Sequence, residues 1–216
     1  MKIGIFGGTF NPIHFGHLRA AEEVAQTFLN KVIFIPTNIS PNKKMPGINP
    51  EKRIEMINIA IKNHKKFESS DIEIKRGGFS YSYDTIVQLE KIYPPDELYF
   101  IVGIDTYLDI KNWKNAAGIL DKINFIVVSR SNKKSGLKNL IKLIDFLPDK
   151  LKEGIKVDYA ENRLITLKGR FIYFFKITRL DISSTVIRNN FKNNISNLFL
   201  LPNEVINYII NNKLYA

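Results

Sequence analysis

The chain has 216 residues, of which 44% are hydrophobic and 25% charged, and this composition fits one globular domain over residues 1–216 with a sizeable core. It contains no cysteine, so disulfides and thiolate metal sites are excluded and a reducing, cytoplasmic location is expected. No apolar run approaches the roughly 18 residues of a membrane span. The net charge of +11 indicates an anionic partner, either a phosphorylated small molecule or a nucleic acid.

The first motif is a glycine-rich turn between a strand and a helix. Ile3 to Phe6 predicts a strand and Leu18 to Phe28 a helix, and residues 7–17 between them read G-G-T-F-N-P-I-H-F-G-H. A helix N-terminus attracts anions, and the paired glycines let the backbone approach a ligand closely. His14 and His17 add donors that can become cationic near neutral pH. The segment is therefore predicted to bind phosphate, although neither common glycine-rich nucleotide fingerprint occurs in the chain.

Residues 7–17 resemble the signature of the nucleotidyltransferases related to class I aminoacyl-tRNA synthetases. Within that superfamily the chain most resembles nicotinate-nucleotide adenylyltransferase. The resemblance implies an α/β fold, a Rossmann-like doubly wound parallel sheet of the nucleotidyltransferase type. It also implies that ATP is bound by Gly7, Gly8, Thr9, Phe10 and His17, and that His14 and His17 are catalytic.

The second strand is followed by a loop at the edge where open α/β sheets bind ligands. Lys31 to Pro36 is a short apolar run typical of a buried parallel strand. The loop after it is rich in proline and asparagine and ends in lysines, which a solvated turn would also explain. The resemblance implies that Asn38 and Lys43 bind the mononucleotide, with Asn42 standing where the family has a histidine.

The next segments predict a helix, a strand and a second turn. Asn49-Pro50-Glu51 is a strong helix start, and the helix is expected to reach about His64. Asp71 to Lys75 alternates like a strand with one exposed face. Residues 76–85 predict a turn that opens a helix, and this alone needs no function. The turn resembles the family pattern G-x-S-Y-T-x-D-T, which implies mononucleotide binding by Tyr81, Ser82 and Thr85.

Another polar group follows the most strand-like run, Leu98 to Val102. Gly103 and Asp105 come directly after it, and the chain's one tryptophan, Trp113, is expected on the next helix. A carboxylate there could hold ribose hydroxyls or a cation, and a tryptophan could stack on a pyridine ring or simply pack in the core. The family pattern implies that Gly103 and Asp105 bind ATP and that Trp113 contacts the nicotinate ring.

The fifth predicted strand, Asn124 to Ser129, is closed by Arg130, and the resemblance places Arg130 near the adenine. Residues 131–181 are less like the family and are interpreted as an insertion or a contact in a homo-oligomer. A hairpin is expected there around Lys168-Gly169.

The last motif, residues 182–188, reads I-S-S-T-V-I-R. Hydroxyl side chains at a helix start cap free N–H groups, and an arginine one turn later adds a fixed cation. Capping alone explains the hydroxyls, but the full run resembles the family motif I-S-S-T-x-x-R. The resemblance implies ATP binding by Ser183, Ser184 and Thr185 and a catalytic role for Arg188.

Together the motifs predict an adenylyltransferase that joins ATP and nicotinate mononucleotide. The reaction needs no protein nucleophile, so Mg²⁺ is expected on the ATP phosphates and no protein metal site is predicted. One alternative is a sister nucleotidyltransferase that acts on pantetheine phosphate, a head-group phosphate or nicotinamide mononucleotide. Another is a non-enzymatic nucleic-acid-binding protein, which would leave His14 and His17 unexplained. The expected partners are therefore ATP and nicotinate mononucleotide, with no nucleic acid and no membrane.

Overall fold

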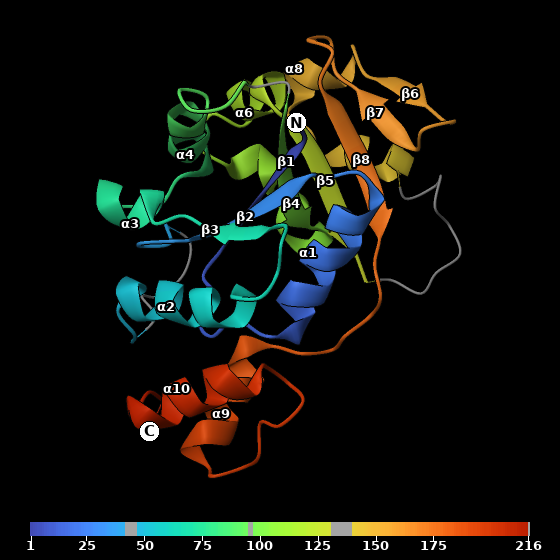
Figure 1. Ribbon diagram of the computed structural model, residues 1–216. Helices are drawn as coiled ribbons and strands as arrows, with labels where there is room; N and C mark the ends of the chain where they lie inside the picture. Colours follow the sequence, from blue (N-terminus) through green and yellow to red (C-terminus); the bar gives the residue numbers. More distant parts are fainter. Residues whose placement is uncertain (42–46, 95–96, 131–139, 216) are drawn as a thin grey trace. The chain divides into compact units, whose positions relative to one another are not determined.

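The computed structural model describes residues 1–41, 47–94, 97–130 and 140–215 (Figure 1). The chain divides into two units, the first made of Met1–Gly7 and Tyr81–Ile177 and the second of Gly8–Ser80 and Thr178–Ala216. The boundary falls between the paired glycines of the first motif. The glycine-rich turn therefore begins in the first unit and continues in the second.

The first unit is built on a mainly parallel sheet with the strand order β1-β4-β5-β8-β7-β6. The pairs β1–β4, β4–β5 and β5–β8 are parallel, and β7 and β6 add two antiparallel pairings. All six residues of β5 are buried, as expected for a continuous apolar run in a parallel sheet. The strands are β1 (Ile3–Gly8), β4 (Leu98–Gly103), β5 (Asn124–Ser129), β6 (Lys156–Asp158), β7 (Arg163–Ile165) and β8 (Phe171–Lys176).

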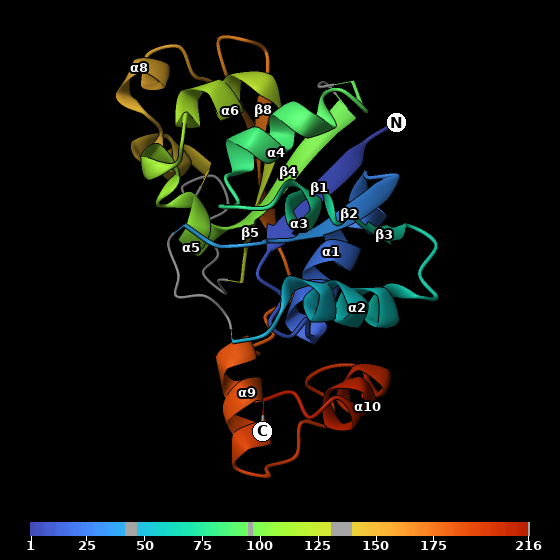
Figure 2. The same ribbon diagram turned by 90° about the vertical axis from the view of Figure 1, so that its left-hand side faces the viewer.

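Short helices connect these strands. They are α4 (Ser82–Leu89), α5 (Ile104–Tyr107), α6 (Ala116–Lys122) and α8 (Asp149–Lys152), with 3-10 turns η2 (Ile110–Asn112) and η3 (Leu143–Phe146). Figure 2 shows α4 and α6 side by side. An ion pair of 2.7 Å between Lys122 Nζ of α6 and Glu90 Oε2, just after α4, joins them. The helix α5 packs on β4 and β5, so the carboxyl end of β4 leads directly into a helix that covers the sheet.

The second unit packs helices around a two-stranded parallel pair. Its strands are β2 (Lys31–Pro36) and β3 (Phe67–Ser69), and its helices are α1 (Phe15–Thr27), α2 (Pro50–Ile61), α3 (Ile72–Arg76), α9 (Ser184–Lys192) and α10 (Asn203–Asn211). The predicted start of α2 is confirmed: Pro50 opens the helix, and Asn49 Oδ1 accepts a hydrogen bond from Glu51 N at 3.0 Å. Helix α2 packs on β2, β3 and α10.

Three details differ from the sequence predictions. Helix α2 ends at Ile61, before His64. The prediction of a strand at Asp71 to Lys75 is wrong, because this segment forms α3 and the strand lies earlier, at β3. An Asp71–Lys75 ion pair of 3.1 Å one helical turn apart supports the helix, and Gly77, at φ +70°, ends it. Trp113 caps the end of η2 and is not inside a helix.

The hairpin predicted in the less family-like region is confirmed. Strands β7 and β8 pair antiparallel, and Gly169 takes φ +74° in the turn between them, a conformation that favours glycine. In the part of the chain that the structure describes, no helix combines the length and apolar character needed to cross a membrane. The predicted α/β class with a mainly parallel sheet is also confirmed.

Candidate active site

The glycine-rich turn is shaped by the ring of Phe10. This side chain is 2% exposed, and a Cβ at position 8 would lie 3.0 Å from its ring, so only glycine fits there without displacing the ring. The ring meets His17 edge-on, with centroids 5.0 Å apart, and it packs on Phe34 of β2 in the same way. The Phe10 ring therefore packs against His17. Because that ring is buried, only the backbone of Phe10 is available to a ligand.

His14 and His17 lie together at the N-terminus of α1. His14 is the N-cap residue, and its ring stacks on that of His17 with centroids 3.7 Å apart and planes 26° apart. His14 is 3% exposed, whereas His17 is partly exposed. The positive end of the helix dipole and two imidazoles thus coincide, which suits the binding of a phosphate group.

The second phosphate motif lies against the first in the same unit. Ser184 Oγ donates to the Pro12 carbonyl at 2.9 Å, and Arg188 Nη1 donates to the Asn11 carbonyl at 2.8 Å. These partners are 172 and 177 residues apart in the chain. Arg188 Nη2 also contacts Thr185 Oγ1 at 3.2 Å, so the guanidinium is held from both sides. The second unit therefore brings both predicted phosphate-binding helix starts together.

The start of α9 is capped as predicted. Ser183 is the N-cap residue, and its Oγ accepts a hydrogen bond from Val186 N at 3.2 Å. Ser183 and Thr185 are exposed, and Ser184 is partly buried.

Arg53 is a buried cation that the sequence analysis missed. It is fully buried, and its guanidinium donates to the carbonyls of Thr9 at 2.8 Å, Thr37 at 2.5 Å and Asn38 at 3.1 Å. Burial lowers the pKa of Arg53, while nearby acidic groups, including Glu51, oppose that change. Arg53 thus links the glycine-rich turn to the loop after β2 by hydrogen bonds, and it places a buried positive charge next to both.

A sequence signal for Arg53 did exist. Arg53, Ile57 and Ile61 are spaced by four residues and share the buried face of α2. An arginine in register with core isoleucines indicates a buried charge with specific partners.

Asn38 joins the loop after β2 to the glycine turn at residues 77–80. Its backbone N donates to Ser80 Oγ at 2.8 Å, and its side-chain Nδ2 donates to the Gly78 carbonyl at 2.9 Å. Ser80 N in turn donates to the Ile39 carbonyl at 2.8 Å. The predicted mononucleotide residue Asn38 is therefore held rigidly by the second predicted turn.

In the first unit, Trp113 lies near the end of β4. The residue is partly buried, and its ring meets Phe100 of β4 edge-on, with centroids 5.9 Å apart. Gly103 is the N-cap residue of α5, and Asp105 lies exposed in the first turn of that helix. The carboxyl end of β4 therefore leads directly into Gly103 and Asp105, and Trp113 packs on Phe100 within the same strand.

Lys114 connects the Trp113 segment to the start of α4. Its Nζ lies 2.8 Å from Asp84 Oδ2 and 4.8 Å from the centre of the Tyr81 ring. Ser82 begins α4, and Thr85 is 1% exposed with its Oγ1 donating to the Tyr81 carbonyl at 3.3 Å. The sequence analysis named Tyr81 and Trp113 but missed the lysine that links their segments.

The remaining predicted residues follow β5 or fall outside the described chain. Arg130 is exposed and follows β5 directly. Lys43 and Asn42 fall outside the described residues. Within the described ranges, no group of three or more histidine and acidic side chains is placed to hold a metal ion.

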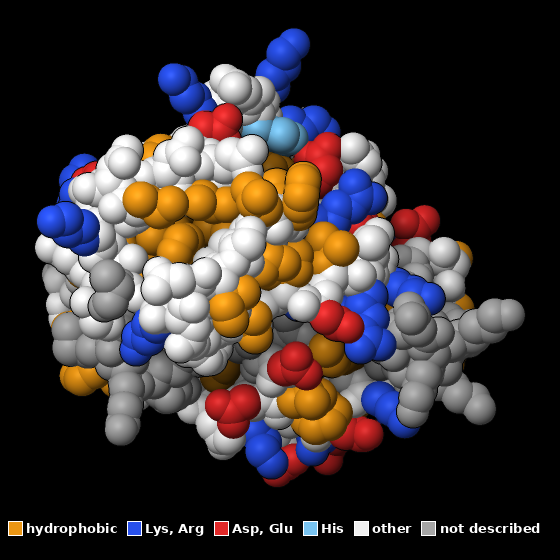
Figure 3. Space-filling view, turned by 90° about the horizontal axis from the view of Figure 1, so that it is seen from below, with side chains coloured by type: hydrophobic (Ala, Val, Ile, Leu, Met, Phe, Trp, Pro, Cys, Tyr) orange, Lys and Arg blue, Asp and Glu red, His pale blue; other side chains and the backbone are white. Residues whose placement is uncertain are grey.

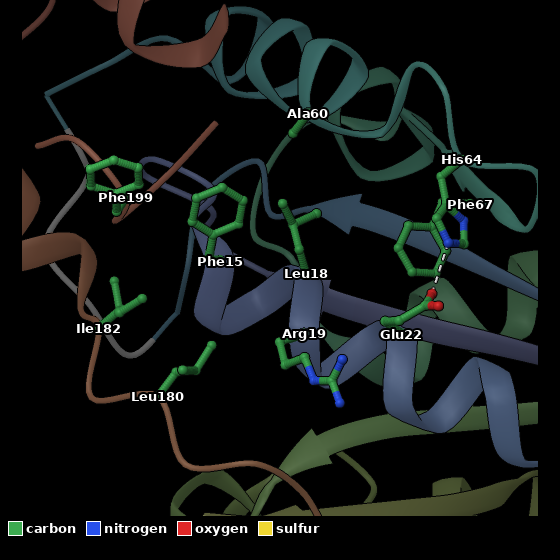
Figure 4. A pocket seen from close by; sticks show the side chains of 10 residues that line it. All are labelled: Phe15, Leu18, Arg19, Glu22, Ala60, His64, Phe67, Leu180, Ile182 and Phe199. Carbon is green, nitrogen blue, oxygen red and sulfur yellow. Dashed lines mark hydrogen bonds and ion pairs between the residues drawn. The ribbon is translucent and has the colours of Figure 1, made fainter. Parts of the chain in front are cut away.

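A separate apolar pocket of 510 Å³ opens in the second unit beside α1 (Figure 4). Phe15 and Leu18 of α1 line it together with Ile182 and Phe199. His64 Nε2 and Glu22 Oε2, 2.7 Å apart, also line the pocket. None of the predicted site residues lines this pocket. Hydrophobic side chains also gather on the face where α9 and α10 lie nearest the viewer (Figure 3). The exposed apolar residues of this region are Val186, Ile195, Leu198, Phe199 and Ile210.

Comparison with known proteins identifies the class. The family model described as cytidylyltransferase-like matches residues 5–190, which span both phosphate motifs. The nicotinic acid mononucleotide adenylyltransferase of Plasmodium falciparum, solved with NaAD, superposes with a TM-score of 0.72 at 20% identity, over 99% of this chain and 97% of that one. The chain is therefore a cytidylyltransferase-like protein with the nucleotidyltransferase fold that the sequence predicted.

Curated relatives narrow the family. A protein of Geotalea daltonii is 42% identical over 100% of this chain and 98% of its own length, and one of Carboxydothermus hydrogenoformans is 38% identical over 99% and 98%. Both are named "Probable nicotinate-nucleotide adenylyltransferase". The chain belongs to the nicotinate-nucleotide adenylyltransferase family.

Proposed function

We propose that the protein transfers the adenylyl group of ATP to nicotinate mononucleotide, giving nicotinate adenine dinucleotide and pyrophosphate. The observation that carries this proposal is the joining of two phosphate motifs in one unit. Ser184 and Arg188 bond directly to the loop that precedes His14 and His17. Two helix N-termini, two imidazoles and one guanidinium thus converge, which suits a triphosphate better than a single phosphate.

The reaction is an in-line displacement at phosphorus. A phosphate oxygen of the mononucleotide forms a bond to the α-phosphorus of ATP, and the bond from that phosphorus to the α,β-bridging oxygen breaks. Both electrons of the broken bond leave with pyrophosphate. Catalysis then consists of positioning the two reactants and stabilising negative charge on the transferring and departing groups.

The second unit supplies the groups for the phosphates. His14 and His17, at the N-terminus of α1, would contact the α- and β-phosphates. Arg188 would hold the departing pyrophosphate, because its guanidinium is already fixed by the Asn11 carbonyl and Thr185. A cation fixed before the reaction loses little freedom when charge develops on the leaving group.

The first unit supplies the groups for the rings and sugars. Trp113 would stack on the nicotinate ring, with Tyr81 and Ser82 beside it. Asp105 would accept hydrogen bonds from ribose hydroxyls. Arg130 would lie near the adenine. In the second unit, Asn38 and Lys43 would contact the mononucleotide.

Magnesium enters as part of the substrate, MgATP. The ion would be held mainly by phosphate oxygens and water, as is usual for magnesium bound to a nucleotide. No step of the reaction is assigned to a protein-bound metal.

The experiment is pyrophosphate release from MgATP with nicotinate mononucleotide and nicotinamide mononucleotide offered in parallel. We expect faster release with the acid. A preparation of Arg188→Ala serves as the background control, because contaminating enzymes would be unaffected by that substitution. Faster release with the amide would keep the reaction and change the acceptor. Release with neither, from folded protein that binds ATP, would contradict the proposal and favour a sister nucleotidyltransferase.

A further inference from the structure

The chain after α10 turns back toward the glycine-rich loop. Leu214 N donates to the Ile209 carbonyl and Lys213 N to the Ile210 carbonyl, both at 3.0 Å, with Lys213 at φ +50°. This is the Schellman arrangement that ends many helices and reverses the chain. The residue that follows the turn is Tyr215, at φ +66°.

Tyr215 is fixed by its ring and by its hydroxyl. The ring stacks on Phe191 of α9, with centroids 6.0 Å apart and planes 24° apart. The hydroxyl donates to Asn11 Oδ1 at 2.6 Å. A positive φ is rare for a bulky aromatic residue and is strained, so these contacts must offset that strain.

The phenol stays a hydrogen-bond donor under ordinary conditions. Burial raises the pKa of Tyr215, while the positive charges of Arg188 and Arg53 act in the opposite direction. The hydroxyl is therefore protonated near neutral pH and can donate to Asn11.

Asn11 is the point where this contact reaches the phosphate motif. The residue is 6% exposed, its carbonyl accepts from Arg188, and it precedes His14 by three positions. The next carbonyl, that of Pro12, accepts from Ser184. Side chains of α9 thus bond to the backbone of the loop. Among the described residues, the hydrogen bond to the Asn11 side chain comes from Tyr215.

We propose that Tyr215 is a positioning residue for ATP, which fixes the loop at Asn11 and thereby the placement of His14 and His17 at the start of α1. This inference rests on the proposed function, in which those histidines bind the ATP phosphates. Tyr215 itself touches no reacting group. It acts through Asn11.

The test compares Tyr215→Phe with Tyr208→Phe. The first substitution removes only the hydroxyl on Asn11 and keeps the ring on Phe191. The second removes the equivalent hydroxyl from α10, where it bonds to Glu55 of α2. Each variant loses one tyrosine hydroxyl from the same region, so the two melting temperatures should change by similar amounts. The affinity for a non-hydrolysable ATP analogue and the KM for ATP and for the mononucleotide are measured for each.

We expect Tyr215→Phe to weaken analogue binding and raise the KM for ATP about three- to tenfold, the range for one lost hydrogen bond. The KM for the mononucleotide should stay within about twofold of the parent value, and Tyr208→Phe should leave all three quantities unchanged. Equal analogue affinity in the two variants would overturn the proposal. If the parent binds the analogue but uses neither mononucleotide, the proposed function fails while this comparison still decides the role of Tyr215.

Discussion

The stacked rings of His14 and His17 place two ionisable groups in direct contact. If both rings carry a proton, their charges repel at the 3.7 Å separation of their centroids. A bound phosphate would offset that repulsion and interact with the N-terminus of α1 at the same time. The two histidines are therefore suited to binding an anionic ligand such as a phosphate group.

Replacing His17 tests this arrangement. We expect His17→Ala to reduce pyrophosphate release by about 10²–10³-fold, the range for removing one preorganised donor at developing negative charge. The melting temperature should change little, because His17 is partly exposed. His64→Ala is the matched control, since His64 pairs with Glu22 beside the apolar pocket. Similar turnover in the two variants would exclude His17 from catalysis.

Arg53 carries a different expectation, because it is fully buried and its three carbonyl partners are partly buried. Arg53→Met should lower the free energy of unfolding by about 3 kcal/mol, since the carbonyls of Thr9, Thr37 and Asn38 lose a charged donor. Urea unfolding measures the change. Arg179→Met removes a guanidinium from an exposed pair with Asp181 and should have little effect. Equal stability of the two variants would show that the buried contacts of Arg53 contribute nothing.

At the scale of elements, α1 is linked to the segment that precedes α9. Thr178 N donates to both carboxylate oxygens of Glu23, at 3.1 and 3.0 Å, and Arg19 Nε contacts the same group at 2.6 Å. Burial tends to raise the pKa of Glu23, but the hydrogen bonds from Thr178 and Arg19 outweigh it and lower the pKa. The ionised carboxylate is therefore the form that the folded chain favours.

This contact predicts a pH-dependent contribution to stability. A carboxyl whose pKa is lower in the folded chain stabilises the fold above its unfolded pKa, and the contribution disappears as the pH falls through the folded pKa. Glu23→Gln should therefore lower the free energy of unfolding by about 1–2 kcal/mol at pH 7. The difference from the parent should shrink below about pH 4. Urea unfolding at pH 7 and pH 3 measures it, and a difference that is equal at both values would contradict the assignment.

Across the whole molecule, the features that sequence predicted best are those set by continuous local patterns. The strands at Lys31–Pro36 and Asn124–Ser129 have the predicted bounds, because uninterrupted apolar runs are characteristic of buried parallel strands. The cap at Asn49 and the hairpin near Gly169 were also predictable from local chemistry. The segment Asp71 to Lys75 was not, since its alternation fits a strand while its ion pair and the following Gly77 favour a helix.

The candidate site was predictable only where its motifs are local. His14, His17 and the run from Ser183 to Arg188 are contiguous patterns that stand out in the chain. Arg53 is marked only by its register with the buried isoleucines of α2, and no short pattern marks the distant partners of Arg53 and Tyr215. Their contributions became visible only once the fold brought the distant segments into contact.

The hydrogen bond between Ser184 and Pro12 also has a consequence for synthesis. Its partners are 172 residues apart, so at about 5–20 residues per second the ribosome needs roughly 10–35 s between making one and making the other. During that interval His14 and His17 have been made, but the helix that bonds to their loop has not. A ligand that needs both helix starts can therefore stabilise this chain only after α9 has been made.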